Sequence, residues 1–319
     1  MSDHRAAIPP VDAGVNRPKW SVMIPTYNCA AFLAETLAGV LQQAPGPEEM
    51  QIEVVDDGSS DDPEAVVRAV GKGRVGFFRQ PENVGHIRNF TTCLTRANGE
   101  LVHLLHGDDK VHDGFYAALQ RGFDSDPAVG AAFCRHAFID EAGAELSVAS
   151  PEQPAAGRLT DALDHLAQEQ RIMTPSIAVR REAYERLGGF DDRLTCSEDW
   201  EMWVRIAAAY PVWYEPQVLA SYRMHKNSNT GRHYRFAQEL KYTNLAIRLF
   251  SHYLPPSRAG DIRRKAGASY ARTALANARE LVRAGDRAGM YAHLWAAVRF
   301  NGPSSMLKAA RIALSAGRR

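Results

Sequence analysis

The sequence has few cysteines and no long hydrophobic run, and each of these features excludes a class of protein. Its four cysteines, Cys29, Cys93, Cys134 and Cys196, are scattered and form no Cys-x-x-Cys pair, so neither a disulfide framework nor a zinc site is expected. No apolar stretch reaches the ~18 residues of a membrane-spanning helix. Residues 1–19 are polar and lack the apolar centre of a signal peptide. We therefore expect a soluble cytoplasmic protein with reduced thiols.

The overall composition is ordinary, but the charge is unevenly distributed. The 319 residues are 45% hydrophobic and 24% charged, as in a globular protein with a sizeable core. Net charge is only +1, yet residues 255–319 hold 13 Lys and Arg against 3 Asp and Glu, so they carry +10 and the remainder carries −9. A basic C-terminal part predicts an anionic contact, such as a membrane surface or a phosphorylated lipid. Solvated, Arg-rich helix faces are the alternative.

Four short apolar runs are each followed by a polar cluster, and helical patterns separate them. The runs are Trp20–Pro25, Ile52–Val55, Val75–Phe78 and Leu101–Leu105, and the clusters that follow them are PTYN, DDGSSD, NVG and HGDD. Strands that alternate with helices are typical of a parallel sheet with crossover helices. Ligands bind at the carboxyl ends of such strands. We therefore predict that the four clusters share one pocket.

Two adjacent acids, Asp108 and Asp109, follow the fourth predicted strand directly. Carboxylates in this place suit a hard cation such as Mg²⁺ or Mn²⁺, held jointly with a phosphate. The alternative is that both acids open the next helix, where the dipole favours negative charge. Because three other polar clusters follow strands in the same way, the metal site is the favoured interpretation.

A glycine-rich stretch invites a different interpretation, which its context contradicts. Gly71–Gly76 fits G-x-G-x-x-G, but a dinucleotide-binding turn must follow a strand and open a helix. This stretch follows a helical pattern and leads into a strand, so we predict a loop. Further strands are predicted at 129–133, 176–179 and 212–222. From about Tyr234 the pattern is helical, and breaks at 255–256, 285 and 302–303 predict roughly four helices.

Two further residues have both a structural and a functional interpretation. Trp200 and Trp203 lie at helical spacing with the apolar residues that follow them. Asp199 then lies in the first turn of that helix, where it serves the helix dipole or projects into a cleft as a functional carboxylate. His225 follows the strand predicted at 212–222, and it is either a ligand or phosphate donor or a polar loop residue.

These clusters, in this order, resemble those of the family-2 inverting glycosyltransferases, which have the GT-A fold. The matching segments are Ile24–Asn28, Val54–Asp61, Asn83–Asn89, Gly107–Asp109, Gly188–Asp191 and Glu198–Trp200. The resemblance covers Trp20 to His225. It implies an α/β fold of GT-A type, in which a mostly parallel nucleotide-binding sheet is flanked by helices and followed by a C-terminal helical extension. The expected parts are a flexible segment 1–19, a nucleotide-binding half of about 20–110, an acceptor half of about 111–230, and a helical region 231–319.

The resemblance also implies roles for single residues. Thr26 and Asp57 would hold the nucleotide base, with Asp57 accepting a hydrogen bond from a ring N–H. Asp109, with Asp108, would replace the acids that bind the metal of the donor diphosphate, although Gly107 stands at the first acid's place in the usual D-x-D. Asp199 would be the catalytic base, and His225 matches a metal or diphosphate contact of some members. The implied donor-binding residues are Pro25, Thr26, Tyr27, Asn28, Asp57, Gly85, Arg88 and Asp108.

The implied activity is inverting transfer of a sugar from a nucleotide-diphosphate sugar, with a UDP-sugar favoured. The acceptor would be a hydroxyl of a glycan or lipid-linked molecule in surface polysaccharide biosynthesis, and the cofactor Mn²⁺ or Mg²⁺. No nucleic-acid partner is expected, and peripheral contact with an anionic inner membrane face is a separate hypothesis. One alternative is a sugar nucleotidyltransferase, which should carry a Gly-rich, basic phosphate loop where PTYN stands. A non-catalytic nucleotide-sugar-binding protein is the other, and the presence of Asp199 argues against it.

Overall fold

The computed structural model describes residues 4–15, 17–225 and 233–316, which divide into two compact units. The first unit contains residues up to 162 together with 172–193 and 209–224. The second contains 163–171, 194–208 and the chain from 225 onward. The boundary predicted near residue 230 and the first three residues of the predicted N-terminal segment lie outside the described part of the chain.

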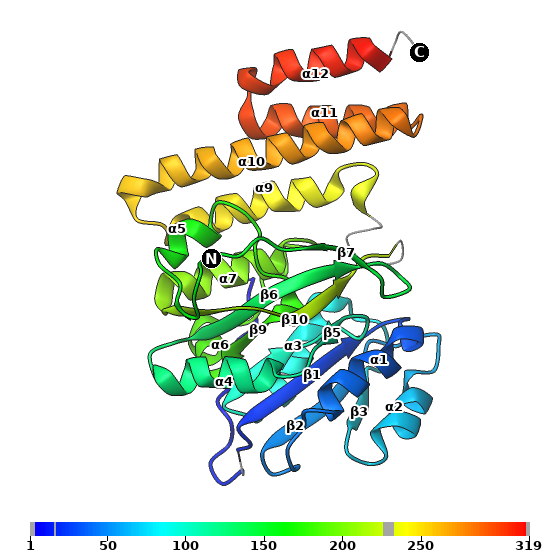
Figure 1. Cartoon of the computed structure of the whole chain (residues 1–319), viewed down its shortest axis with the longest axis vertical. Helices are drawn as coiled ribbons and strands as arrows, with labels where there is room; N and C mark the ends of the chain where they lie inside the picture. Colours follow the sequence, from blue (N-terminus) through cyan, green and yellow to red (C-terminus); the bar gives the residue numbers. More distant parts are fainter. Residues whose placement is uncertain (1–3, 16, 226–232, 317–319) are drawn as a thin grey trace. The chain divides into compact units, whose positions relative to one another are not determined.

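The first unit contains a ten-stranded sheet (Figure 1). Its strands are β1 Trp20–Thr26, β2 Met50–Asp56, β3 Gly76–Arg79, β4 Leu101–Leu104, β5 Lys110–Val111, β6 Ala131–Ile139, β7 Glu145–Val148, β8 Gly157–Arg158, β9 Ile177–Arg180 and β10 Val212–Arg223. Their order is β3-β2-β1-β4-β9-β6-β10-β5, with β7 beside β6 and β8 beside β10. The strands β3, β2, β1 and β4 are parallel, whereas β9 runs antiparallel to both β4 and β6. The four predicted parallel strands are therefore confirmed, and the sheet as a whole is mixed.

Helices cover both faces of this sheet. They are α1 Ala30–Leu41, α2 Pro63–Gly71, α3 His86–Arg96, α4 Phe115–Ser125 and α6 Arg181–Leu187, and η1 at Thr174–Ser176 is a 3-10 turn. Apolar residues of α1, α2 and α4 share one core with the strands, and Figure 1 shows α1 and α2 in front of β1 to β3. The glycines after α2 form the predicted loop, in which Lys72 takes a left-handed conformation.

The N-terminal segment packs on the first unit between His4 and Pro9. Arg5 forms a β-bridge with Asp191, and the Gly189 N–H donates a hydrogen bond to the Ala6 carbonyl. Ile8 is buried, and the Pro9 carbonyl accepts a hydrogen bond from the Arg181 guanidinium. These residues therefore contribute to the packing around α6.

The second unit is helical in the described residues. Its helices are α5 Ala162–Leu166, α7 Glu198–Ala209, α9 Gln238–Phe250, α10 Pro256–Arg283, α11 Arg287–Asn301 and α12 Pro303–Ala316, and η2 at Ser251–Tyr253 is a 3-10 turn. The predicted breaks separate α9 to α12, and Gly285 and Gly302 have the positive φ that lets a helix stop there. Small and aliphatic residues of α10, α11 and α12 share a core. No described helix is long and apolar enough to cross a membrane.

Candidate functional site

The polar loops after β1, β2 and β4 meet at one edge of the sheet. Thr26 is the register partner of Asp56 at the ends of β1 and β2. The backbone N–H of Asp57 donates to the Thr26 carbonyl at 2.9 Å, and that of Gly107 donates to the Pro25 carbonyl at 3.1 Å. The end of β1 therefore joins the loop that carries Asp57 to the loop that carries Asp108 and Asp109.

Asn28 ties the loop after β1 to the loop after β2. Its backbone is left-handed, with φ of 51°, a conformation that asparagine tolerates better than most residues. Its Oδ1 accepts from the Ser60 N–H at 2.7 Å, and its own N–H donates to the Ser59 Oγ at 2.9 Å. Thr26 beside it is buried, whereas Tyr27 remains 42% exposed. Of this cluster, Tyr27 and Asn28 are thus exposed, and the Tyr27 ring makes no contact with another described residue of the kind that ties Asn28 to the second loop.

Asp57 lies buried at the end of β2 and joins the third polar loop. Its two carboxylate oxygens accept from the backbone N–H groups of Val84 and Gly85, at 2.8 and 3.0 Å. Burial raises the pKa of this carboxyl above its usual value. Each carboxylate oxygen has a second lone pair, so Asp57 is held in place and can still accept a hydrogen bond from a ligand.

Arg88 lies on α3, which begins directly after Gly85. Its side chain is exposed, and no hydrogen bond or ion pair joins its guanidinium to another described residue. Arginine suits phosphate because its planar fork donates to two oxygens at once. The predicted contact of Arg88 with the donor stays a prediction, for which the side chain is available.

The two acids after β4 lie in different surroundings. Asp108 is half-buried, whereas Asp109 is only 1% exposed. Oδ1 of Asp109 accepts from the Arg223 backbone N–H at 2.8 Å, while Oδ2 accepts no hydrogen bond from any described residue and lies 3.5 Å from Nδ1 of His106. Burial raises the pKa of Asp109 to about 6. A buried carboxylate oxygen without a donor is costly, and a cation beside it would offset that cost.

His106 is a third candidate ligand that the sequence analysis missed. One ligand atom from each of His106, Asp108 and Asp109 lies within 4.8 Å of the other two. The imidazole stacks on the Phe90 ring, with centroids 5.3 Å apart and 15° between the planes. The spacing His-x-Asp-Asp after a strand was the available signal. Carboxylate oxygens with one imidazole fit a divalent metal such as Mn²⁺, so these residues fit the expected cofactor.

The glycine at the first position of the usual acidic motif has a steric cause. A Cβ at Gly107 would lie 2.7 Å from Oγ1 of Thr26 and 2.9 Å from Sγ of Cys29, closer than such atoms approach. The Thr36 hydroxyl of α1 donates to the Gly107 and Asp109 carbonyls at 3.1 and 2.8 Å. The loop is therefore pressed against β1 and α1, and no acid fits at position 107.

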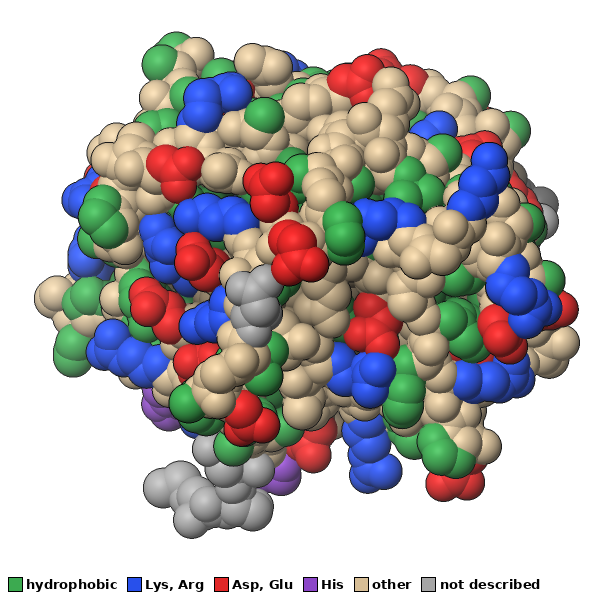
Figure 2. Space-filling model, turned by 90° about the horizontal axis from the view of Figure 1, so that it is seen from below, with side chains coloured by type: hydrophobic (Ala, Val, Ile, Leu, Met, Phe, Trp, Pro, Cys, Tyr) green, Lys and Arg blue, Asp and Glu red, His purple; other side chains and the backbone are tan. Residues whose placement is uncertain are grey.

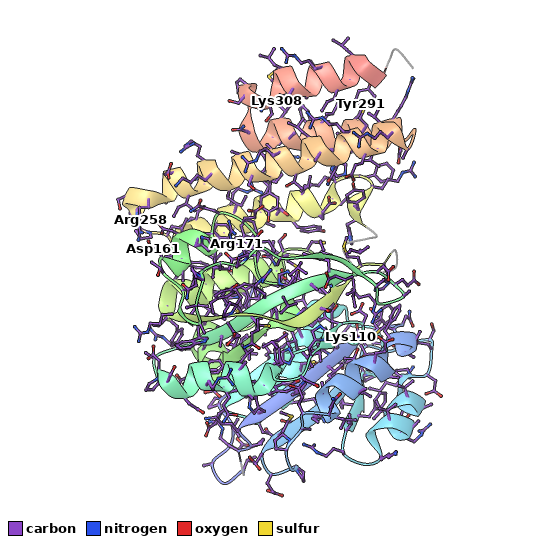
Figure 3. The ribbon with its side chains drawn as sticks, in the orientation of Figure 1. Lys110, Asp161, Arg171, Arg258, Tyr291 and Lys308 are labelled. Carbon is purple, nitrogen blue, oxygen red and sulfur yellow. The ribbon has the colours of Figure 1, made fainter. Side chains whose placement is uncertain are left out.

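Arg223, at the end of β10, holds the acidic loop from the opposite side. Its guanidinium is buried and donates to the Asp108 carbonyl, to the Glu141 carbonyl and to the Glu35 carboxylate, at 2.8, 3.0 and 2.8 Å. Glu35 also pairs with Lys110, which Figure 3 labels on β5. Because its backbone N–H binds Asp109, Arg223 holds both acids, and no sequence pattern indicated this role.

Asp199 lies in the first turn of α7, in the second unit. Its Oδ2 accepts from Nε2 of Gln170 at 2.8 Å, and its Oδ1 accepts from the Trp200 N–H at 2.7 Å. The backbone N–H of Gln170 in turn donates to the Tyr270 hydroxyl on α10. The Trp200 ring lies 4.8 Å from that of Phe250 and 5.2 Å from that of Tyr270. Side chains of α9 and α10 thus fix the helix start that carries Asp199.

Two predicted site residues belong to the second unit, so their placement beside the strand-end loops stays a prediction. These are Asp199 and His225. His225 is half-buried and directly follows Met224, whose N–H donates to the Ile139 carbonyl. The predicted donor-binding residues of the first unit other than Arg88, by contrast, lie on strand-end loops that the described hydrogen bonds join to one another.

Comparison with known sequences shows the class of protein. Residues 21–188 match the family described as glycosyl transferase family 2, and this is more than half of the chain. The chain therefore belongs to glycosyl transferase family 2, and it is an enzyme of the glycosyltransferase class. This confirms the resemblance on which the predicted roles rest.

Two curated relatives illustrate the likeness. An uncharacterised glycosyltransferase of Rickettsia typhi is 24% identical over 67% of this chain and 66% of its own length. A Campylobacter jejuni protein, named as a GalNAc(5)-diNAcBac-PP-undecaprenol beta-1,3-glucosyltransferase, is 33% identical over 33% of this chain and 34% of its own length. The chain thus spans about two thirds of the first relative and one third of the second.

Two solved structures share the fold. S. aureus TarS 1-349 in complex with UDP-GlcNAc has a TM-score of 0.61 at 15% identity, over 88% of this chain and 91% of that chain. The mannosyltransferase PcManGT from Pyrobaculum calidifontis, in complex with GDP-Man and Mn²⁺, has a TM-score of 0.60 at 22% identity, over 98% of this chain and 83% of that one. The predicted GT-A type of α/β fold is therefore confirmed.

Proposed function

We propose that this enzyme transfers a sugar from a nucleotide-diphosphate sugar to a hydroxyl of a glycan or lipid-linked acceptor, with inversion at the anomeric carbon. A UDP-sugar is the favoured donor, and surface polysaccharide biosynthesis is the proposed role. The observation that carries the proposal is the buried carboxylate of Asp109, whose Oδ2 lacks a hydrogen-bond donor in the described chain and lies beside Asp108 and His106.

The strand-end loops of the first unit would bind the donor. Asp57 would accept a hydrogen bond from the nucleotide base, and the exposed Tyr27 ring would pack on that base. Arg88 would donate to the diphosphate. His106, Asp108 and Asp109 would hold a divalent ion, which neutralises the charge that builds on the leaving diphosphate. The solved mannosyltransferase complex with GDP-Man and Mn²⁺ supports this type of donor and cofactor.

The donor set favours Mn²⁺ over Mg²⁺ as the proposed ion. Mg²⁺ prefers an octahedral shell of oxygen ligands, whereas an imidazole nitrogen suits transition metals. His106 supplies such a nitrogen one residue before the position where an acid is sterically excluded. We therefore assign His106 the place in the metal shell that the missing acid leaves open.

Asp199 would be the general base of the transfer. The acceptor oxygen bonds to the anomeric carbon while the bond from that carbon to the diphosphate oxygen breaks, and the leaving nucleotide keeps the electron pair. The acceptor proton goes to the Asp199 carboxylate, which typically contributes ~10²–10⁴ in rate. One direct displacement inverts the anomeric configuration. Gln170 and the Trp200 N–H would hold the carboxylate in orientation.

The acceptor class rests on a relative rather than on the site. The Campylobacter jejuni relative is named for an acceptor carried on PP-undecaprenol, which supports a lipid-linked glycan as one candidate acceptor. Such an acceptor lies at a membrane surface. The proposed function therefore includes peripheral contact of the basic C-terminal region with an anionic bilayer.

A donor screen tests the transferase proposal. Purified protein is incubated with single nucleotide-diphosphate sugars and Mn²⁺, and the released nucleoside diphosphate is measured with and without a chelator. We expect slow, chelator-sensitive release from one donor class, with UDP-sugars first. Tight nucleotide binding with no release from any donor, and no transfer to glycan acceptors, would instead indicate a non-catalytic binding protein.

A further inference from the structure

Exposed hydrophobic side chains gather in the last part of the second unit. Of the eleven large hydrophobic side chains that the described residues expose, six lie between positions 236 and 314. They are Phe236, Tyr291, Trp295, Met306, Leu307 and Leu314. On the face seen in Figure 2, by contrast, acidic and basic side chains alternate and hydrophobic ones are scattered. Such a gathering on a soluble surface indicates an interaction site.

The last described helix, α12, exposes apolar side chains on the face turned away from its core. Met306, Ala310 and Leu314 lie four residues apart and are exposed, and Leu307 beside them is 75% exposed. The inner face is occupied by the buried residues Ser305, Ala309 and Ile312. A helix face that met only water would present polar residues. The outer face of α12 therefore has the pattern of an interfacial helix.

The neighbouring helix α11 has an exposed row of aromatic and basic residues. Arg287, Tyr291, Trp295 and Arg299 follow one another at intervals of four, and all four are exposed. Trp295 and Arg299 also line a groove with residues of α9. Figure 3 labels Tyr291 on α11 and Lys308 on α12. Tyr and Trp prefer a boundary at which one end of the ring is apolar and the other is wet.

The charges around these apolar residues indicate which kind of partner this surface binds. Arg299, Lys308 and Arg311 are exposed, and none has an acidic partner among the described residues, whereas Arg264 and Lys265 of α10 both pair with Asp261. The segment 255–319 carries +10, so two copies of this surface would repel each other. Exposed aliphatic side chains add nothing to the binding of a soluble polyanion. Cations flanking an aliphatic row match an anionic bilayer.

We infer that the outward side chains of α11 and α12 bind an anionic phospholipid bilayer. Met306, Leu307 and Leu314 enter the boundary between headgroups and acyl chains, and Lys308 and Arg311 bind lipid phosphates. Tyr291 and Trp295 lie at the headgroup level. This inference rests on the proposed function only for its choice of a lipid surface, because the site of sugar transfer lies outside α11 and α12.

Sedimentation of the full chain with vesicles tests the inference. The probes are phosphatidylcholine vesicles with and without half phosphatidylglycerol. We expect binding to the anionic vesicles alone, weakened about fivefold for each cation removed in Lys308→Gln and Arg311→Gln. Leu307→Gln should weaken it about tenfold. The matched control is Leu146→Gln on β7, which is as exposed as Met306, at 56%, and it should bind like the unaltered protein.

Tryptophan fluorescence gives a second, local readout. Trp20, Trp200 and Trp203 are buried and Trp213 is half-buried, whereas Trp295 is 66% exposed. Anionic vesicles should therefore shift the emission to the blue in the unaltered protein and leave it unshifted in Trp295→Phe.

Four outcomes would overturn the inference, and the first three concern vesicle binding and self-association. They are equal binding to both kinds of vesicle or to neither, vesicle binding that Leu307→Gln leaves unchanged, and a concentration-dependent dimer that Leu307→Gln dissociates. Displacement of the vesicles by poly-glutamate at matched charge would also overturn it, in favour of an acidic protein partner. Release of nucleoside diphosphate is measured without vesicles in each variant. Intact release with lost vesicle binding separates a membrane result from a failure of the transferase proposal.

Discussion

Asp109 and Asp199, the two carboxylates that the proposed reaction needs most, are held in opposite ways. Asp109, in the first unit, is almost fully buried, and only one of its oxygens accepts a hydrogen bond from the described residues. Asp199, in the second unit, is half-buried, and both of its oxygens accept one, from Gln170 and from its own helix. Asp109 thus has one buried oxygen without a hydrogen-bond donor in the described chain, whereas hydrogen bonds to both oxygens fix the orientation of Asp199.

This difference fits different tasks. A buried carboxylate oxygen without a donor costs stability unless a cation arrives, so Asp109 would lower the stability of the free enzyme and favour the proposed metal. A base must instead hold its direction and keep a lone pair for the acceptor proton. The hydrogen bonds from Gln170 and from the Trp200 N–H hold the Asp199 carboxylate in one direction. The comparison therefore predicts that substitutions at the two sites separate metal binding from turnover.

The largest effect is expected from Asp199→Asn, which keeps the shape and removes the base. The rate constant of transfer should fall ~10²–10⁴-fold, while calorimetry with the nucleoside diphosphate and Mn²⁺ gives an unchanged affinity. Asp261→Asn, at an exposed acid of α10, is the control and should keep full activity. Full turnover in Asp199→Asn would remove this residue from the mechanism.

Asp109→Asn should instead weaken metal binding, because it removes a negative charge from the proposed metal site. Mn²⁺ affinity, measured by electron paramagnetic resonance without any donor, should fall by about 100-fold or more. The control is Asp113→Asn, an exposed acid four residues along the chain. If a chelator leaves nucleoside diphosphate affinity unchanged in the unaltered protein, the metal has no part in donor binding.

The same substitution should stabilise the metal-free enzyme above neutral pH. The pKa of Asp109 is about 6 in the folded state, against ~3.9 in an unfolded chain. Between these values the unfolded state loses its proton first, so the unaltered protein loses stability as pH rises from about 4 to about 6. Denaturant unfolding in chelator should then show Asp109→Asn more stable by about 2 kcal/mol at pH 8 and little changed at pH 4. Parallel stability curves for both proteins would contradict this account.

Most of the sheet edge that is proposed to bind the donor could be predicted from the sequence, since it depends on local patterns. The strands β1, β2 and β4 end where apolar runs meet PTYN, DDGSSD and HGDD, and the ends of parallel strands meet at one edge. The helix at 86–96 and the breaks between the C-terminal helices follow equally from local signals. These features need no knowledge of distant contacts.

The residues that sequence reasoning missed act through distant contacts. His106 gains its role because Gly107 is pressed against Thr26 and Cys29, about 80 residues earlier in the chain. Arg223 reaches the acidic loop across more than 100 residues, and Gln170 reaches Asp199 across 29. No spacing rule relates such pairs. The strand β9 was predicted at 176–179, but its antiparallel direction was not, because its apolar run resembles those of the neighbouring strands.

Arg223→Lys tests whether the proposed metal binding at Asp109 depends on Arg223 holding the acidic loop in place. Lysine keeps the charge but cannot reach the Asp108 carbonyl, the Glu141 carbonyl and Glu35 together. Because residues that orient ligands typically affect metal affinity 10- to 100-fold, we expect a loss of about tenfold in Mn²⁺ affinity. Arg181→Lys replaces an equally buried arginine of the same unit, bonded to the Pro9 carbonyl. It should lower stability and leave Mn²⁺ affinity unchanged. Equal losses of affinity in both variants would reduce Arg223 to a general packing role.

The smallest effect is expected at Gln170, which orients the other carboxylate. In Gln170→Leu the Asp199 carboxylate loses a donor at 2.8 Å, and a hydrogen bond to a charged group is worth ~1.5–3 kcal/mol. Part of this lost free energy raises the ground state, and only the remainder raises the barrier. We therefore expect kcat to fall about fivefold, with KM for the donor unchanged. The acid limb of the pH profile of kcat should move to higher pH, because the charged form of Asp199 is less well stabilised. Gln168→Leu, whose amide donates to the Asp164 carbonyl instead, should leave both kcat and the profile unchanged. A lower kcat with an unmoved pH profile would mean that Gln170 has only a packing role at α7. The hydrogen bond from the Trp200 N–H would then be the remaining evidence that Asp199 is oriented as a base.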